Sequence, residues 1–226
     1  MDRNSGINRR MKSQMNHRGF SLVELLVVIT IIAILVGLST SFTSDIQDSI
    51  ELATTSGEVV TILNQARETA LATNQNIEVR FYLNASEFSD EPDEYNLIGV
   101  GSPMPPSDPD DPNFDDPEQW EFKETIAKFS LPRSTFIRVD DPSFSPVITA
   151  DEELGVRRGT EDDPVRGQLA YSSISFTTDN QASLDPDQDW TLIIVNRSDS
   201  TKSLAEINFA TLQLFPRTGR VVLIQK

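Results

Sequence analysis

The sequence predicts an α+β protein in which one long N-terminal helix packs on an antiparallel β-sheet domain. An almost unbroken apolar run begins at residue 20, and apolar residues at helical spacing follow it, with no proline before residue 73. Further along, short segments alternate apolar and polar side chains, as half-buried strands do. A chain of 226 residues has room for one such domain and an appended segment.

Residues 1–19 are expected to form a basic leader. They hold five basic residues and one acid, a balance of +4, whereas the whole chain carries -16, so the remainder carries -20. A body this acidic disfavours nucleic acid as a partner, because phosphate binding needs a basic surface. The chain has no cysteine, and its one histidine, His17, lies in the leader. A mature protein without the leader would therefore have no thiolate or imidazole site.

The apolar run predicts a membrane span within residues 20–40. From Phe20 to Leu38 the only charged residue is Glu24, and a helix of this length covers about 28 Å, close to the roughly 30 Å of a bilayer core. By the positive-inside rule, the leader would stay in the cytoplasm and the acidic body would be exported. A secretory signal is the first alternative, but the run is long for one, and Gly37-Leu38-Ser39 is only a loose match to a cleavage site. A plain signal anchor remains open.

Glu24 is the informative residue of this run. A carboxylate near the middle of a bilayer costs about 2.5 to 3.5 kcal/mol on insertion scales, and less towards the interface. An acid at this place therefore suggests a function and a partner. The alternative is that Glu24 lies at the depth of the headgroups, where it costs little.

The stretch RGFSLVELLVVITIIAILVG, from Arg18 to Gly37, closely resembles the N-terminus of type IV prepilins and type II secretion pseudopilins. The resemblance implies a pilin-like fold, cleavage between Gly19 and Phe20 by a prepilin peptidase, and methylation of the new amine of Phe20. It also implies that Glu24 pairs with that amine on a neighbouring subunit during assembly. Each charge is expensive in lipid without the other, so pairing would select the register of the incoming subunit. A contact between Phe20 and Glu24 within one chain, at i,i+4 spacing, could satisfy both charges before assembly.

The helix is expected to continue from the membrane to residue 73, so that residues 20–73 form one N-terminal helix. Its second half shows an apolar stripe and a charged face, and the stripe is expected to pack on the sheet. Residues 37–41 are rich in small and hydroxyl side chains, where the helix could bend. The stripe consists of Phe42, Ile46, Ile50, Ala53, Gly57, Val60, Leu63, Ala66 and Ala70.

Residues 74–226 are expected to form an exported, β-rich globular domain. Alternation and β-branched or aromatic content predict seven strands. They are expected at residues 77–83, 95–100, 135–139, 173–177, 190–195, 207–215 and 220–224. Two segments rich in acids, near 84–118 and 140–166, are expected to be surface loops, the first also because of its prolines.

The sequence DPDQD offers a weak candidate for a calcium site. Asp185, Asp187 and Asp189 stand at alternate positions, as at the start of a calcium-binding loop. An EF-hand is excluded, because Trp190 occupies the place of the sixth-position glycine and Asn196 that of the twelfth-position glutamate. A solvated acidic turn is the favoured interpretation, and no cofactor is expected.

Looser resemblances narrow the class of protein. The segments within residues 63–81 and 174–224, including a final Gly-Arg hairpin, resemble minor pseudopilins of the H type and their FimT relatives. KFSLPRSTFIRV and the final hairpin also resemble the prepilin-like cassette protein D family of verrucomicrobial genomes. The resemblances imply a structural subunit, of the minor kind, of a type IV pilus or type II secretion pseudopilus. Its partners would be the prepilin peptidase, other pilin subunits and the inner membrane.

Two other classes remain as alternatives, a membrane-anchored exported enzyme and an anchored binding module that is not built into a filament. Against an enzyme, no nucleophile with a base, phosphate-binding loop or metal cluster is evident in the sequence. We therefore expect no catalysis. Only the filament subunit requires Glu24.

Overall fold

The computed structural model describes residues 21–84, 94–105, 108, 110–112, 121–141, 143–163 and 167–225. The predicted cleavage site, Gly19 and Phe20, lies outside the described residues. The chain forms two compact units, Met1–Asp45 and Ile46–Lys226. The second unit holds a helix and a large antiparallel sheet, which confirms the prediction of an α+β fold.

The long helix α1 spans Leu22–Thr73 and thus enters both units. Its residues favour this length because no proline interrupts it and each half is rich in apolar side chains. The predicted helix is confirmed, including residues 37–41, which are helical. Within the described part of the chain, no helix has the length and apolar character to cross a membrane, so the predicted span within 20–40 is not confirmed.

The second half of α1 packs on the sheet with a face that differs from the predicted stripe. Leu63, Ala66 and Ala70 are buried as predicted, but Ile46 and Ile50 are 59% and 61% exposed. The buried face continues instead through Leu52, Thr55, Ser56 and Val59. Apolar residues lie on two sides of this helix, and small hydroxyl residues complete the buried one, so periodicity alone selects the wrong side in its first turns.

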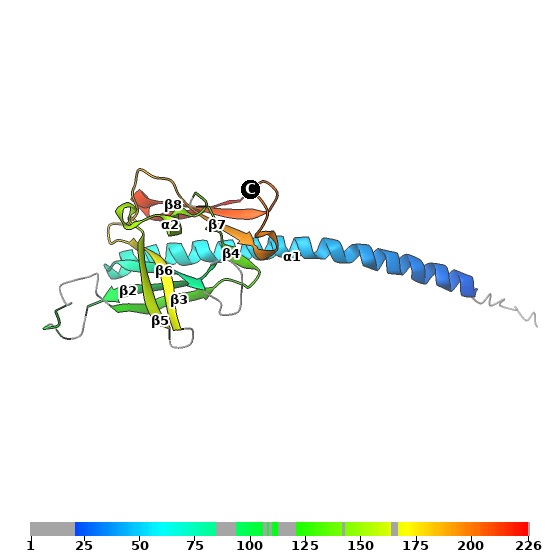
Figure 1. Cartoon of the computed structure of the whole chain (residues 1–226), viewed down its shortest axis with the longest axis horizontal. Coiled ribbons are helices and arrows are strands. Elements are labelled where there is room, and N and C mark those ends of the chain that lie inside the picture. Colours follow the sequence, from blue (N-terminus) through cyan, green and yellow to red (C-terminus); the bar gives the residue numbers. More distant parts are fainter. Residues whose placement is uncertain are drawn as a thin grey trace, which may run out of the picture. The chain divides into compact units, whose positions relative to one another are not determined.

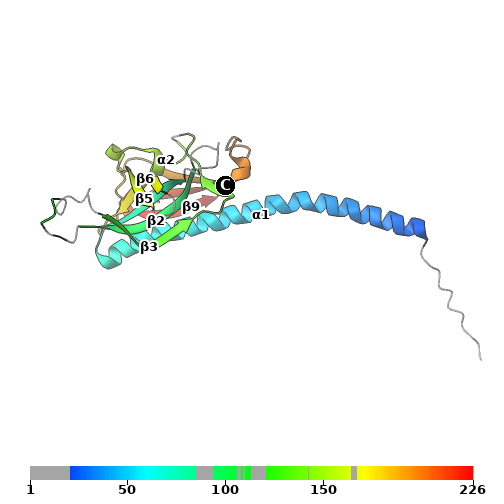
Figure 2. The same ribbon diagram turned by 60° about the horizontal axis from the view of Figure 1, so that its bottom comes forward.

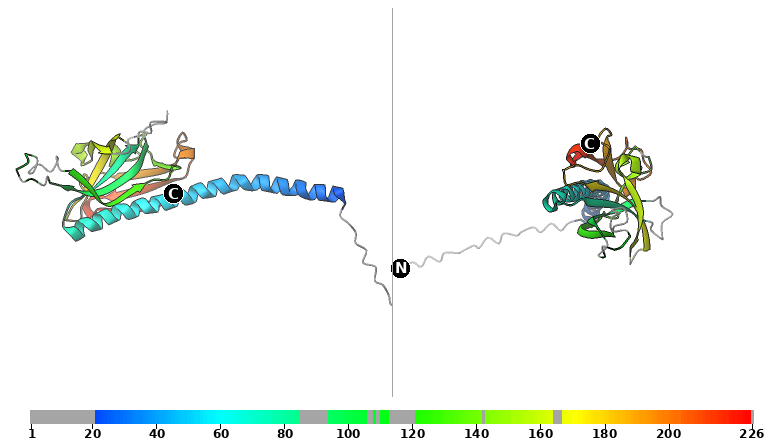
Figure 3. Two further views of the ribbon diagram at one scale, coloured as in Figure 1. Left: turned by 90° about the horizontal axis from the view of Figure 1, so that it is seen from below. Right: turned by 90° about the vertical axis from the view of Figure 1, so that its left-hand side faces the viewer.

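In the described part of the chain, nine antiparallel strands form one sheet, with neighbours in the order β5-β6-β1-β2-β4-β7-β8-β9 and with β3 also paired to β2. Figure 1 shows most of these strands beside the second half of α1. The strands are β1 (Ile77–Asn84), β2 (Glu94–Met104), β3 (Glu121–Ser130), β4 (Thr135–Ile137), β5 (Arg157–Asp163), β6 (Gly167–Phe176), β7 (Trp190–Asn196), β8 (Phe209–Phe215) and β9 (Arg220–Gln225). In Figure 3 the strands lie on one side of the second half of α1. The sheet and this part of the helix enclose the core.

Strand β2 divides the sheet, because two strands share one of its edges. Along that edge, β3 pairs with residues 97–104 of β2, and Figure 2 shows these two strands side by side. Further along the same edge, Ile137 of the short β4 pairs with Tyr95 of β2. A register shift between Val100 and Gly101 lets β3 follow β2. A side chain at Gly101 would place its Cβ 2.1 Å from the carbonyl oxygen of Lys123, so the close approach of β3 requires glycine there.

The core follows the alternation of the strands. Ile77, Val79 and Phe81 of β1 point into it and are at most 2% exposed, as the sequence pattern predicts. Trp190 at the start of β7 is fully buried, and its indole Nε1–H donates to the carbonyl oxygen of Asp185 at 2.7 Å. Burial of aromatic and branched side chains between helix and sheet supplies the main favourable free energy of this unit.

Both predicted acidic loops contain secondary structure. The prediction for residues 140–166 is partly wrong, whereas in residues 84–118 the strand predicted at 95–100 is confirmed and is longer than predicted. Residues 140–166 include the short helix α2 (Pro146–Thr149), a turn of 3-10 helix at Glu152–Leu154, and β5. Residues 84–118 include β2. Strand β5 has the sequence RRGTEDD, with no apolar residue, and it lies at the edge of the sheet, where pairing to β6 needs only its backbone.

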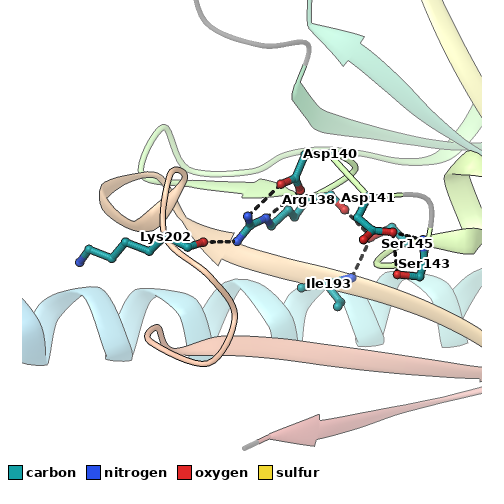
Figure 4. Close-up of polar contacts among 7 residues, drawn as sticks. All are labelled: Arg138, Asp140, Asp141, Ser143, Ser145, Ile193 and Lys202. Carbon is teal, nitrogen blue, oxygen red and sulfur yellow. Dashed lines mark hydrogen bonds and ion pairs between the residues drawn. The ribbon is translucent and has the colours of Figure 1, made fainter.

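Arg138, which follows β4, joins its own loop to the segment between β7 and β8 (Figure 4). It is 7% exposed, and its Nε and Nη2 donate to the two carboxylate oxygens of Asp140 at 2.7 and 2.8 Å. Its Nη1 donates to the carbonyl oxygen of Lys202 at 2.9 Å. Ser145 donates from Oγ to the carbonyl oxygen of Arg138 and accepts the N–H of Ile193. These hydrogen bonds from Arg138 lower the pKa of Asp140.

Candidate functional site

The start of α1 forms a reciprocal cap. Ser21 directly precedes the first helical residue, Leu22, and its Oγ accepts the backbone N–H of Val23 at 3.3 Å. The carboxylate of Glu24 accepts the backbone N–H of Ser21 at 3.4 Å. The bond from the Ser21 N–H to the acid three positions later is that of a capping box. The hydroxyl differs from the standard box, because it accepts the N–H of the second helical residue instead of the third. The pattern S-x-x-E was present in the sequence and would have revealed it.

Glu24 thus has a partner within its own chain, which sequence reasoning missed. Its carboxylate lies in the first turn of α1, where the positive end of the helix dipole favours negative charge. The 3.4 Å bond to Ser21 is long, and Glu24 is exposed. The carboxylate can therefore accept a further hydrogen bond from a cation without leaving the cap.

Glu24 lies in a row of apolar side chains that stay largely exposed among the described residues. Their exposed fractions run from 47% at Val28 to 83% at Leu22. Contiguous apolar surface of this kind indicates a partner or an apolar solvent. The row consists of Leu22, Val23, Leu25, Leu26, Val27, Val28, Ile29, Ile31, Ile32, Ile34, Leu35 and Val36.

The side chains of the three candidate calcium ligands, Asp185, Asp187 and Asp189, have three different surroundings. The Asp185 carboxylate accepts the backbone N–H of Asp187 at 2.9 Å, which closes the turn. The Asp187 carboxylate pairs with Arg217 at 3.0 Å. Asp189 lines a pocket beside this turn. Among the described residues, no three acidic or other metal-binding side chains gather as a cation site would require, so the structure gives the calcium candidate no support.

Arg80 is the centre of the most buried charged cluster. It donates to the carboxylates of Glu78 and Glu161 at 2.8 and 2.9 Å, and its guanidinium lies over the rings of Phe122 and Tyr171 at 3.9 and 4.1 Å. Burial would lower the pKa of Arg80, but the hydrogen bond and charge of Glu78 raise it. Burial also raises the pKa of Tyr171. The carboxylates and rings around Arg80 already engage its guanidinium, so the cluster joins strands and offers no reactive group.

Sequence reasoning also missed a group of three arginines around the pocket beside Asp189. Arg67 comes from α1, Arg217 from the turn after β8, and Arg220 from β9. Arg217 and Arg220 are close in the sequence, but no local pattern connects them to Arg67. Only the packing of α1 against the end of the sheet brings the three together.

Comparison with known proteins identifies the N-terminal segment. Residues 14–40 match the family described as the prokaryotic N-terminal methylation motif. No curated protein matches the chain. Among solved structures, the minor pseudopilin EpsH from the type 2 secretion system of Vibrio cholerae is similar at 10% identity, with a TM-score of 0.41, over 77% of this chain and 97% of that one. The match over residues 14–40 confirms the predicted N-terminus, and the chain therefore carries the N-terminal methylation motif of prepilin-type proteins.

Proposed function

We propose that the chain is a structural subunit, of the minor kind, of a type IV pilus or type II secretion pseudopilus. The observation that carries the proposal is the methylation motif over residues 14–40, whose described part is a helix with apolar side chains exposed along its length. A prepilin peptidase cuts between Gly19 and Phe20 and methylates the new amine. The subunit has no catalytic role and needs no cofactor.

The exposed apolar row explains where the subunit resides before and after assembly. Side chains that are 47–83% exposed in the isolated chain are stable only in apolar surroundings. Before assembly the inner membrane provides them, with the leader in the cytoplasm and the unit Ile46–Lys226 in the periplasm. In the filament, helices of other subunits replace the lipid, and the row becomes part of a helix bundle.

Glu24 links processing to assembly. Cleavage creates a cation at Phe20, and a carboxylate in apolar surroundings favours a cation within reach. In the free subunit, the bond between Glu24 and the Ser21 N–H holds the carboxylate at the end of the helix. In the filament, the amine of a neighbouring subunit approaches that carboxylate and fixes the axial register.

Mass spectrometry of the mature N-terminus tests the proposal directly. The expected species begins at Phe20 and is heavier by one methyl group. A chain that keeps its leader, or one that is cut after Gly37, would contradict the proposed processing.

Two substitutions separate the charge of Glu24 from its cap. Glu24→Gln keeps an oxygen that accepts the Ser21 N–H but removes the negative charge. Ser21→Ala keeps the charge but removes the Oγ that accepts the Val23 N–H, and it weakens the helix end by about 0.5–2 kcal/mol. We expect both variants to be cleaved, and Glu24→Gln alone to be lost from purified filaments. Equal incorporation of Glu24→Gln and the unchanged chain would disprove the pairing.

A further inference from the structure

A pocket lies at one end of the sheet, within the unit Ile46–Lys226. Its volume is about 570 Å³, within the range of sites that bind small ligands or short peptide segments. Arg67 of α1, Asn180 of the turn after β6, and Arg217 and Arg220 around the β8–β9 turn line it. None of these residues takes part in the filament contacts proposed above.

Two residues that line the pocket each have one buried polar atom without a partner among the described residues. The Nε of Arg67 and the Oδ1 of Asn180 are buried, and neither has a hydrogen bond to another described residue. Buried polar atoms normally have a partner, since each unpaired one costs free energy. One of these atoms is a donor and the other an acceptor. Both atoms are closed to solvent, so a ligand reaches Arg67 and Asn180 only through their other atoms.

The backbone fixes both residues in place. Asn180 has a φ of 69°, in the left-handed region that asparagine tolerates. Gly219 has a φ of 58°, and a Cβ at this position would lie 3.0 Å from the Cδ of Arg67 and 3.2 Å from the carbonyl oxygen of Asn180. The glycine turn therefore covers the stem of Arg67 closely. The wall is formed before any ligand arrives, which limits the entropy that binding costs.

The charge of the pocket is opposite to that of the body. Residues 20–226 carry -20 in total, yet three arginines and one acid, Asp189, line this pocket. Arg217 pairs with Asp187, but both side chains are mostly exposed, at 72% and 83%, so the pair is weak and can be exchanged. The pocket therefore favours an anion.

The rest of the lining is mixed, with Gln188, Gln213 and Thr218 beside four apolar residues. Phe215 is 42% exposed although it is a large aromatic residue, and Leu214, Pro186 and Pro216 lie beside it in the same lining. An exposed aromatic side chain next to arginines is typical of protein interfaces. A free inorganic anion would leave this apolar surface uncovered.

We propose that this pocket binds an acidic peptide segment of a partner protein. Carboxylates of the segment accept hydrogen bonds from the guanidinium groups of Arg67 and Arg220, and an apolar side chain covers Phe215. Nucleic acid fits less well, because the acidic body repels it. The proposal does not depend on filament assembly.

Fluorescence anisotropy with the full chain in detergent micelles tests the proposal. The probe is a labelled, acetylated and amidated Asp-Asp-Phe-Asp-Asp peptide, and the control peptide has asparagine in place of each aspartate. We expect only the acidic peptide to bind. Arg67→Met keeps the packed stem and removes the guanidinium, and Arg220→Gln removes an exposed charge. Each should raise the Kd about tenfold, the value of one charge-assisted hydrogen bond. Arg133→Gln, an exposed arginine outside the pocket, should leave the Kd unchanged.

Other outcomes would overturn the proposal. Equal binding of the neutral peptide would show a purely apolar site. Complete displacement of the peptide by a short oligothymidylate at equal concentration would show that the arginines bind phosphates instead. Loss of affinity in Arg133→Gln as large as in Arg220→Gln would show attraction by overall charge. If circular dichroism shows that Arg67→Met is unfolded, Arg220→Gln decides, since its side chain is exposed and makes no core contact.

Discussion

The two halves of α1 have similar apolar side chains but different surroundings. Between Leu22 and Val36 the large apolar side chains are 47–83% exposed, whereas the face from Leu52 to Ala70 is at most 5% exposed. Helix propensity does not explain this difference, because both halves are helical. The second half is covered by its own sheet and stabilises the fold. The first half is left largely uncovered by the described residues, and in the proposed function its side chains serve association.

The largest expected effect on the free energy of unfolding comes from a cavity in the buried second half of α1. Leu63 is 2% exposed, so Leu63→Ala removes buried methyl groups and leaves a cavity, and should lower the free energy of unfolding by about 2–5 kcal/mol. Ile32 is 53% exposed, so Ile32→Ala should change it by less than about 0.5 kcal/mol. Urea unfolding of the full chain in micelles measures both values. Equal losses for the two variants would contradict the contrast between the halves.

A smaller effect should follow when the link between α1 and the edge of the sheet is cut. Asn64 donates from Nδ2 to the carbonyl oxygens of Val60 and Val221 at 3.0 and 3.2 Å, and its Oδ1 accepts the Val221 N–H at 3.4 Å. Asn64→Ala leaves polar groups of Val221 unpaired beside the core and should cost about 1–3 kcal/mol. The amide of Val221 should also exchange hydrogen faster.

Thr61 provides the matched control for this substitution. It lies one turn earlier on the same helix, and its exposed hydroxyl donates only to the carbonyl oxygen of Gly57. We expect Thr61→Ala to leave both the stability and the Val221 exchange unchanged. Unchanged exchange in Asn64→Ala would show that β9 does not need the helix for its pairing.

The smallest expected effect is a loss of stability at low pH. In the unit Ile46–Lys226, part of this loss should come from protonation of Asp140. Hydrogen bonds from Arg138 lower the pKa of Asp140 below its ordinary value of 3.8. Such a carboxylate stabilises the fold above the unfolded pKa and loses this effect as the pH falls through the folded pKa. Asp140→Asn should therefore reduce the loss of stability between roughly pH 5 and pH 2. The difference should be only about 0.2–1 kcal/mol, because the Asp140 side chain is 55% exposed.

Asp141 provides the control for the effect of Arg138 on Asp140. Its pKa is also lowered, by hydrogen bonds from Ser143, but it has no arginine partner and is fully exposed. Asp141→Asn should flatten the profile less than Asp140→Asn does. Identical profiles for Asp140→Asn and the unchanged chain would show that Arg138 keeps its place through Lys202 and Ser145 alone.

The sequence predicted those helices and strands in which buried and exposed side chains alternate with a regular period. The helix end at Thr73 and the alternation of β1 are visible in the sequence because burial there follows a regular period. Strand β5 was missed because an edge strand pairs through its backbone and needs no apolar residue. Strand β3 was missed because it continues beside β2 only across a register shift, and the long acidic segment before it dominates the composition.

The candidate sites, too, were predicted where a local pattern marks them and missed where only the folded chain brings residues together. Glu24 was found because a charge in an apolar run is a local anomaly, and its cap with Ser21 is also a local pattern. The buried side of α1 was assigned correctly at Leu63 but not at Ile50, since only the position of the sheet decides which apolar side it covers. The three arginines of the pocket could not be predicted, because Arg67 and Arg220 meet only after the chain has folded.

The continuity of α1 from Leu22 to Thr73 also has a mechanical consequence. In the proposed filament, tension applied along the helix axis would reach the residues from Leu52 to Ala70, which contact the sheet along several turns. These contacts, with the bonds of Asn64 to Val221 and of Asn196 to the carbonyl oxygen of Asp48, are then loaded together in shear rather than broken one by one. The helix can therefore bear a load that a peptide attached by a single loop could not.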